Sequence, residues 1–337
     1  MPTPAISIAQ VTKTFGPKVA VRSLDLEIQE GALCGFIGPN GAGKTTTIRM
    51  IMSILFPDEG RISVLGKASA VESKDRIGYL PEERGVYRKM KVGAFLNYMA
   101  RLKGIDPSAS DRAVREWLGR MGLADTYKKR CEELSKGMQQ KVQFITAVIH
   151  KPDLIILDEV FSGLDPVNRR LMRELIDEQH RRGCTIIFST HAMFEAEQLC
   201  DQIFMIHKGD KVLDGSLRDI VARFDPRSLF VEAVAGDGET TLRSVPGVRD
   251  VSRAGRESAR GALVAHLDEH ADPGEVMRRV VAAFPVRRIE ITQPSLEDIF
   301  IDTVLGTNRA GAASTASPDE RESLRNQLAL AGQEEGQ

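Results

Sequence analysis

The sequence lacks the features that would carry the chain into or across a membrane. No apolar run approaches the roughly 18 uncharged residues that a membrane span requires, and the longest runs, LIIL and TIIF, are the size of a strand. The first residues, MPTPAISIAQ, contain no basic segment followed by an apolar core, so we expect no export signal. A role at a membrane would therefore need a separate membrane-embedded subunit.

The chain also lacks an excess of charge and an ordered set of cysteines. Its formal net charge is −1 over 337 residues, so no overall basic field attracts nucleic acid or an anionic membrane. We expect reduced thiols in a cytosolic protein, because the cysteines do not have metal-ligand spacing: Cys34, Cys131, Cys184 and Cys200. A nucleic acid or a membrane partner would therefore have to be recognised by a local group of residues.

What is present is an α/β pattern interrupted by helices. Strand-like segments run from Ile6 to about Gly66, and helical periodicity begins near Gly85. Three helices are predicted there, one ending at Gly104, one at 110–122 starting on Ser110, and one starting at Ser135 and ending before Pro152. Apolar runs typical of parallel strands buried on both faces then follow at 154–157, 185–189 and 202–206. With the helices between them, these runs predict a βαβ core.

The composition divides the chain into three parts. We expect an α/β nucleotide-binding domain at residues 1–224, with a helical subdomain at about 85–150. Residues 225–305 contain four short strand patterns with a helix between the last two, which predicts a small α+β accessory domain of ferredoxin-like topology. Residues 306–337 are small and polar, and we predict a disordered tail.

A phosphate-binding pattern, GPNGAGKTT at 38–46, directly follows the apolar strand ALCGFI. Its glycines allow backbone N–H groups to surround phosphates, Lys44 reaches the β- and γ-phosphates, and the Thr45 hydroxyl can ligate Mg²⁺. This loop alone does not distinguish a kinase, a GTPase, a motor or a transporter subunit. The residues predicted to bind nucleotide here are Gly38, Pro39, Asn40, Gly41, Ala42, Gly43, Lys44, Thr45 and Thr46.

Two further strands end in candidate catalytic side chains. LIILDEV, at 154–160, ends in Asp158, which suits a Mg²⁺ shell, and Glu159, which can polarise an attacking water. FSTHAMFEAE places His191 after the next apolar strand, where it can hydrogen-bond a γ-phosphate and help to hold the water and Glu159. The predicted catalytic residues are therefore Lys44, Glu159 and His191, and the first predicted metal ligands are Thr45 and Asp158.

LSKGMQQKVQ, at 134–143, looks like a second anion site far from the phosphate-binding loop. Ser135 is a candidate helix N-cap, and Lys136 and Gly137 keep the turn open and cationic before an apolar helical pattern. The alternative is an ordinary capped helix.

In their order, GPNGAGKT, LSKGMQQ, LIILDE, SGLD and STH resemble the motifs of the ATP-binding cassette (ABC) ATPases over roughly residues 4–220. The resemblance implies that two nucleotide-binding subunits meet head to tail, so that Ser135 and Gly137 of one close on the ATP of the other. It also implies that Phe15 stacks on adenine and that Asp165 lies at the subunit interface. Glu82 occupies the loop where the family usually has a glutamine.

Four positions depart from the family pattern. Glu82 replaces the glutamine with a carboxylate, which can still ligate Mg²⁺ but adds negative charge beside a triphosphate. Lys136 replaces the first glycine of the signature, and Met138 stands where glutamine is common. Val160 replaces a usual proline, which loosens the turn that aims the preceding carboxylate. Because no predicted catalytic side chain is lost, we expect a working ATPase whose rate these changes can lower.

LPEERGVYRKMKV, LSKGMQQKVQF and QPSLEDIFI look like the bacterial sodium-extrusion (Nat-type) ATPases and related export subunits. This resemblance implies a cytoplasmic, peripheral subunit on the inner face of the cell membrane that works with a separately encoded permease. A coupling helix of the permease would enter a groove along 82–92. The basic residues there either contribute to that contact or are simply solvated: Arg84, Arg88, Lys89 and Lys91. We expect an exporter ATPase that uses ATP and Mg²⁺ and has no direct contact with nucleic acid.

Two other interpretations stay open. A clamp ATPase on nucleic acid or the ribosome would predict a long coiled coil before LSKGMQQ or two cassettes in one chain, and neither pattern is present. Alternatively, residues 225–305 form a ligand-binding regulatory domain, although their strands carry no glycine-rich motif or metal cluster. We favour a dimer-stabilising or regulatory role for this domain, without a named ligand.

Overall fold

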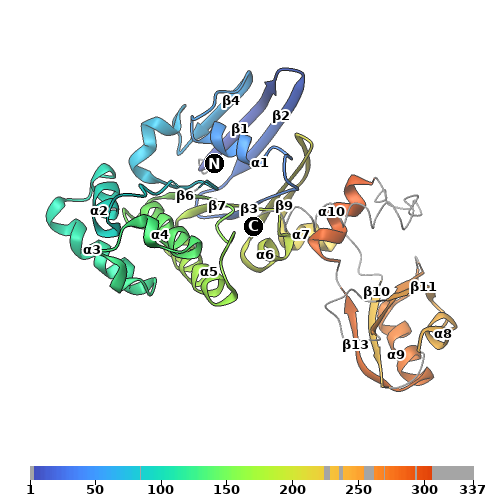
Figure 1. The fold of residues 1–337 in the computed structure, drawn as a ribbon. Helices are drawn as coiled ribbons and strands as arrows, with labels where there is room; N and C mark the ends of the chain where they lie inside the picture. The colour runs from blue at the N-terminus through green and yellow to red at the C-terminus, as the bar shows by residue number, and fades with distance from the viewer. Residues whose placement is uncertain are drawn as a thin grey trace. The chain divides into compact units, whose positions relative to one another are not determined.

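The computed structural model describes residues 4–83, 85–223, 228–234, 238–253, 262–268, 270–292 and 294–305. The chain divides into two compact units, Met1–Leu217 with Phe300–Gln337 and Arg218–Ile299 (Figure 1). The smaller unit is therefore inserted into the sequence of the larger one. The predicted boundary at 224 and the predicted disorder of 306–337 lie outside the described residues and stay predictions.

Within the described part of the larger unit, two sheets form the frame. An antiparallel sheet has the order β2-β1-β4, from β1 (Ile6–Phe15), β2 (Lys18–Ile28) and β4 (Glu59–Val64). The other sheet has the order β5-β6-β7-β3-β8-β9 and is parallel except for its last pair. Its strands are β3 (Leu33–Ile37), β5 (Ile77–Leu80), β6 (Leu154–Asp158), β7 (Thr185–Thr190), β8 (Gln202–His207) and β9 (Asp210–Ser216).

The central strands are buried because their sequences are apolar at almost every position. All residues of β3, β6 and β7 are buried, as expected for strands covered on both faces. The helix α6 (Met193–Leu199) and the residue after it come close at Gly35, where a Cβ atom would lie 3.4 Å from Ala196 Cβ and 2.9 Å from Cys200 Sγ. The helices that follow these three strands are α1 (Lys44–Ile51), α5 (Pro166–Arg181) and α6. The helix α7 (Leu217–Arg223) follows β9 and contains the boundary between the two units.

The helical part between β5 and β6 contains α2 (Val92–Leu102), α3 (Pro107–Arg120) and α4 (Lys136–Val148) (Figure 1). The helices ending near Gly104 and starting after Ser135 are confirmed. The predicted start of α3 at Ser110 is wrong. The Asp106 side chain accepts a hydrogen bond from the Ser108 N–H at 2.8 Å and caps the helix, and Pro107 is the first helical residue.

The smaller unit combines a four-stranded antiparallel sheet, order β11-β12-β10-β13, with helices. This order confirms the predicted ferredoxin-like topology. The short helix α8 (Gly238–Arg243) has no counterpart among the predicted elements. The other elements are β10 (Ser228–Ala233), β11 (Val248–Arg253), β12 (Ala262–Leu267), α9 (Pro273–Ala283) and β13 (Val286–Thr292). A last helix, α10 (Leu296–Val304), leads back to the larger unit.

In the ranges that the structure describes, no helix is both long enough and apolar enough to cross a membrane.

Candidate active site

The phosphate-binding pattern forms a tight turn between β3 and α1. A Cβ atom on Gly38 would lie 2.2 Å from Ile206 O, and one on Gly43 would lie 2.6 Å from Ala20 O. Only glycine fits at these two places, because backbone from β8 and β2 packs directly against the turn. The turn thus packs between β2 and β8, and the helix α1 begins directly after it, with Lys44 as the first helical residue.

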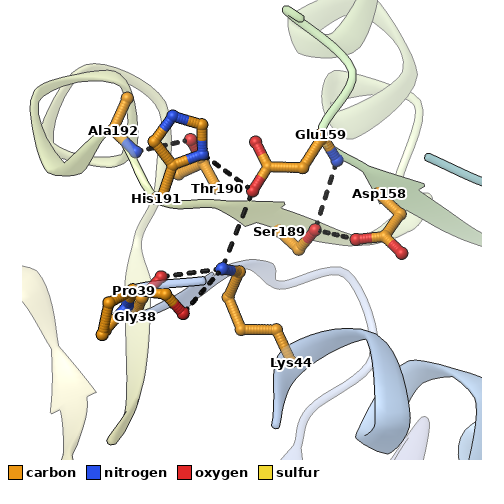
Figure 2. Close-up of polar contacts among 9 residues, drawn as sticks. All are labelled: Gly38, Pro39, Lys44, Asp158, Glu159, Ser189, Thr190, His191 and Ala192. Atoms are coloured by element: carbon orange, nitrogen blue, oxygen red, sulfur yellow. Dashed lines mark hydrogen bonds and ion pairs between the residues drawn. The ribbon is translucent and has the colours of Figure 1, made fainter. Parts of the chain in front are cut away.

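Lys44 folds back over this turn. Its Nζ donates hydrogen bonds to Gly38 O at 2.7 Å and Pro39 O at 3.3 Å, and it lies 3.7 Å from Glu159 Oε1 (Figure 2). The side chain is buried, with 5% exposed. One ammonium group therefore joins the turn to the end of β6.

Asp158 and Glu159 follow each other at the end of β6 but face different partners. Asp158 is fully buried, and its Oδ1 accepts a hydrogen bond from the Ser189 hydroxyl. Its Oδ2 has no hydrogen-bond partner in the described part of the chain. Burial raises the pKa of Asp158, and the charge of Glu159 raises it further, whereas the Ser189 hydrogen bond, the Lys44 charge and the Thr45 hydroxyl lower it.

Glu159 connects Lys44 to His191. His191 Nδ1 lies 3.1 Å from Glu159 Oε1, the oxygen that also faces Lys44 (Figure 2). Because an ionised carboxylate only accepts hydrogen bonds, Nδ1 carries the proton in this contact. The turn after β7 that presents His191 is held by the Ala192 N–H, which donates to Thr190 Oγ1 at 2.9 Å.

The structure thus brings together four predicted residues from three separate strand ends: Lys44, Asp158, Glu159 and His191. Glu82 is exposed in the bend after β5. Burial, and then the negative charges of Asp158 and Glu82 among others, raise the pKa of Tyr79 to about 12.

Other predicted residues contact different parts of the chain. Ser135 Oγ accepts the Met138 N–H at 3.3 Å and caps α4. A Cβ atom on Gly137 would lie 3.4 Å from Leu164 Cδ2, so this residue packs on the SGLD loop of its own chain. Phe15 is 48% exposed, with Lys13 Nζ 5.6 Å from its ring centre.

Asp165 caps α5, and it accepts the Asn168 N–H at 2.9 Å and the Asn168 side-chain amide at 2.6 Å. The loop before it is fixed from α5. Arg169 Nε donates to Leu164 O at 2.9 Å, and its Nη1 donates to Glu195 Oε1 at 3.3 Å. Glu195 is 5% exposed, and burial raises its pKa, as does the charge of Glu159.

Sequence reasoning missed the contacts of Ser189 and Glu195. Ser189 pairs with Asp158 in the parallel register of β6 and β7, so aligning the two strand patterns at their polar ends is a signal that indicates it. Glu195 lies in the short helix α6 and looks like a surface residue in the sequence. Its burial depends on Arg169 from another helix, and no local pattern indicates that contact.

Comparisons with known proteins agree with this geometry. A family profile described as ABC transporter matches residues 21–162, and one described as ATP-binding protein DrrA1-3-like, C-terminal domain, matches residues 215–304. The uncharacterized ABC transporter ATP-binding protein YhaQ of Bacillus subtilis is 42% identical over 89% of this chain and 98% of its own length. The chain belongs to the ATP-binding proteins of ABC transporters.

This ABC ATP-binding protein also resembles NatA of Bacillus subtilis, which is 40% identical over 60% of the chain and 83% of NatA. A solved structure described as the ATP binding subunit of an ABC transporter is 29% identical with a TM-score of 0.61, covering 66% of this chain and 93% of that one. The predicted family and the P-loop α/β fold are therefore confirmed. The protein is an ATPase whose activity is coupled to transport.

Proposed function

We propose that the chain is the ATP-hydrolysing subunit of a bacterial exporter, in which two nucleotide-binding subunits power a separately encoded permease. The observation that carries this proposal is the contact of Glu159 Oε1 with both Lys44 Nζ, at 3.7 Å, and His191 Nδ1, at 3.1 Å. A buried carboxylate between a lysine of a phosphate-binding turn and a histidine suits the activation of water beside a γ-phosphate.

The side chains divide the chemistry of hydrolysis. Lys44 turns from Glu159 to the β- and γ-phosphates of ATP and offsets their charge. Glu159, released from that ion pair, polarises the attacking water. His191 holds the Glu159 carboxylate through Nδ1 and orients it towards the water.

The residues present fit a magnesium ion. Asp158 Oδ2 is buried without a hydrogen-bond partner in the described ranges, which is costly unless a cation or donor completes it. In the described residues, no group of three or more His, Cys, Asp or Glu side chains is placed to hold a metal ion by itself. Mg²⁺ commonly uses one or two carboxylates together with phosphate oxygens and waters. Asp158 and Thr45 are the proposed ligands, with Glu82 at the edge, and the ion would neutralise phosphate charge.

A second subunit would complete the nucleotide site. Within one subunit, Ser135 caps α4 and Gly137 packs on the SGLD loop, so neither contacts Lys44, Glu159 or His191 in the described contacts. In a head-to-tail dimer the start of α4 would meet the partner's γ-phosphate, with Asp165 beside it. Phe15, half exposed at the end of β1, would stack on adenine.

The permease would bind the helical part near 82–92, at the inner face of the membrane. Tyr87 and Tyr98 are 53% and 44% exposed, and their ring centres lie 6.1 Å apart. Exposed aromatic side chains of this kind commonly anchor protein interfaces. Outward transport follows from the resemblance to sodium-extrusion ATPases, and the similarity to NatA supports that branch.

Residues 1–224 would form the motor domain and 225–305 a dimer-stabilising or regulatory domain.

The test traps the closed dimer. Glu159→Gln should keep ATP bound without hydrolysis, and light scattering after size exclusion should show a dimer with Mg-ATP and a monomer without it. Ser135→Arg in the same background should abolish the dimer. Ser108→Arg, at an exposed serine in the first turn of α3, is the matched control and should still dimerise.

The contrary result would be that the Glu159→Gln protein binds ATP and forms the same dimer whether or not it also carries Ser135→Arg. That outcome would remove Ser135 from the proposed interface. A wild-type protein that binds no ATP would overturn the proposed site as a whole.

A further inference from the structure

One buried hydroxyl, that of Ser189, lies between Asp158 and Glu159. Ser189 is 0% exposed and sits opposite Asp158 in the parallel pairing of β6 with β7. Its O–H donates to Asp158 Oδ1, and its Oγ accepts the Glu159 N–H at 3.2 Å (Figure 2). The Glu159 N–H also points to Ser189 O at 3.2 Å, so it is shared between two acceptors of one residue.

The hydrogen bond from Ser189 to Asp158 decides which of the two carboxylate oxygens of Asp158 remains available to a ligand. A serine hydroxyl has a single hydrogen, and Ser189 uses it on Oδ1. Oδ2 is left as the buried oxygen without a hydrogen-bond partner in the described residues. Ser189 therefore fixes the rotation of the carboxylate, with one oxygen engaged within the sheet and the other kept for a ligand.

The bond to Glu159 supports an unusual backbone conformation. Glu159 has φ = +50°, in the left-handed region that residues other than glycine rarely occupy. Such conformations persist only where surrounding contacts hold them, and they gather at functional sites. Here the N–H of the strained residue is held by Ser189, and the carboxylate faces Lys44 and His191.

We infer that Ser189 is a positioning residue of the ATPase: its one hydroxyl turns Asp158 towards Mg²⁺ and holds Glu159 in the left-handed conformation that aims its carboxylate. This inference rests on the roles proposed above for Asp158 and Glu159. It assigns to β7, through Ser189, a part in arranging two side chains at the end of β6, namely that of its last residue, Asp158, and that of the next residue, Glu159.

A purely structural serine would give a different result on substitution. Ser189→Ala leaves Asp158 Oδ1 without its donor and removes one of the two acceptors of the Glu159 N–H. Ser189→Thr keeps the hydroxyl at the expense of one added methyl group. If Ser189 serves folding alone, the alanine variant loses stability, while its kinetic constants and metal dependence stay as in the wild type.

The experiment measures kcat and KM for ATP, together with the binding of a fluorescent ATP analogue in Mg²⁺ and in EDTA. For Ser189→Ala we expect kcat to fall about 10- to 100-fold, the range typical when a partner that orients a metal ligand is lost. Mg²⁺ should then increase nucleotide affinity less than in the wild type, while affinity in EDTA is unchanged. Ser189→Thr should restore both readouts.

Thr185→Val is the matched control, because it removes another buried hydroxyl from the same strand. Thr185 is 2% exposed, and its Oγ1 accepts the Gly31 N–H at 2.9 Å, at the opposite end of β7 from Ser189. It should lose stability and keep the wild-type kcat and Mg²⁺ dependence.

An alanine variant with wild-type kcat and Mg²⁺ dependence would overturn the inference while leaving the proposed function standing. Failure of the proposed function is seen separately, as a wild-type protein without Mg-ATP binding. If Ser189→Ala does not fold, Ser189→Cys takes its place, because a thiol is a weak donor of similar shape and should give an intermediate loss. Wild-type kcat and Mg²⁺ dependence in Ser189→Cys would then overturn the inference.

Discussion

Two half-buried histidines show how differently one residue type is used in this protein. His191 faces Glu159 in the candidate site, whereas His150 lies just after α4 with its Nε2 3.2 Å from Ile77 O. Burial, and then the positive charge of Lys103, lower the pKa of His150 to about 4. The folded protein therefore keeps His150 neutral at a pH where an unfolded chain would protonate it.

His150 should make the larger unit sensitive to acid. Its folded pKa is below its unfolded value, so its contribution to stability is complete above about pH 6.5 and is lost as the pH falls towards 4. Between about pH 7.5 and about pH 5, the wild type should lose about 2 kcal/mol more free energy of unfolding than His150→Gln. Urea unfolding of both proteins at the two pH values measures this difference. Equal losses in the two proteins would show that His150 is not held neutral.

At the scale of helices and strands, the sequence indicates some elements well and others poorly. Strands β6, β7 and β8 match the predicted apolar runs to within one residue, because strands buried on both faces are apolar throughout. Side chains at the ends of such strands, Asp158 and His191 among them, could be predicted to gather because those ends meet at one edge. The cap at Asp106 was missed because it depends on the particular turn before α3.

Contacts between elements could not be predicted from local patterns. Arg169 is an example, since it joins α5 to the loop before it and to α6 through Leu164 O and Glu195. The sequence shows only an arginine on a helix. Its partners lie in a loop and in another helix, and only the packing of α5 beside α6 brings them within reach.

Arg169→Met should loosen this connection. Glu195, 7% exposed at its side chain, would lose its cation, and leaving a buried polar group unsatisfied costs about 1 to 3 kcal/mol. We also expect a lower kcat, since the loop with Asp165 and the helix after His191 would no longer be tied together. Arg170→Met is the control. Arg170 is 84% exposed and forms an ion pair with Glu174 on the same helix, so urea unfolding and ATPase assays should both remain near wild type.

At the scale of the whole molecule, residues from the C-terminal end of the described chain pack into the larger unit. Phe300 is fully buried, and its ring lies 5.5 Å from that of His207, edge to face. His207 ends β8, two residues before Gly209, whose N–H donates to Ala42 O at 2.9 Å. The segment after the smaller unit thus supports the strand that packs against the phosphate-binding turn.

Phe300→Ala should therefore weaken the larger unit, although residue 300 lies outside the match to the ABC transporter profile at 21–162. Loss of a buried phenylalanine typically costs about 3 to 5 kcal/mol. In a thermal unfolding experiment, the transition whose midpoint rises when ATP is added belongs to the larger unit, because that unit binds ATP. We expect the midpoint of this transition to be lower in Phe300→Ala than in the wild type. Phe230→Ala, in β10 of the smaller unit, is the control, and an equal shift in both variants would contradict this role of Phe300.

The strand order has a consequence for how the protein is made. β3, which leads into the phosphate-binding turn, lies between β7 and β8, so both of its neighbours come from much later in the chain. At typical rates of protein synthesis, about 10 to 30 seconds pass between translation of β3 and of β8. During that interval the apolar segment LCGFI has no sheet to join and is a natural site for a chaperone on the growing chain. The nucleotide site, begun among the first fifty residues, is thus one of the last parts of the larger unit to be completed.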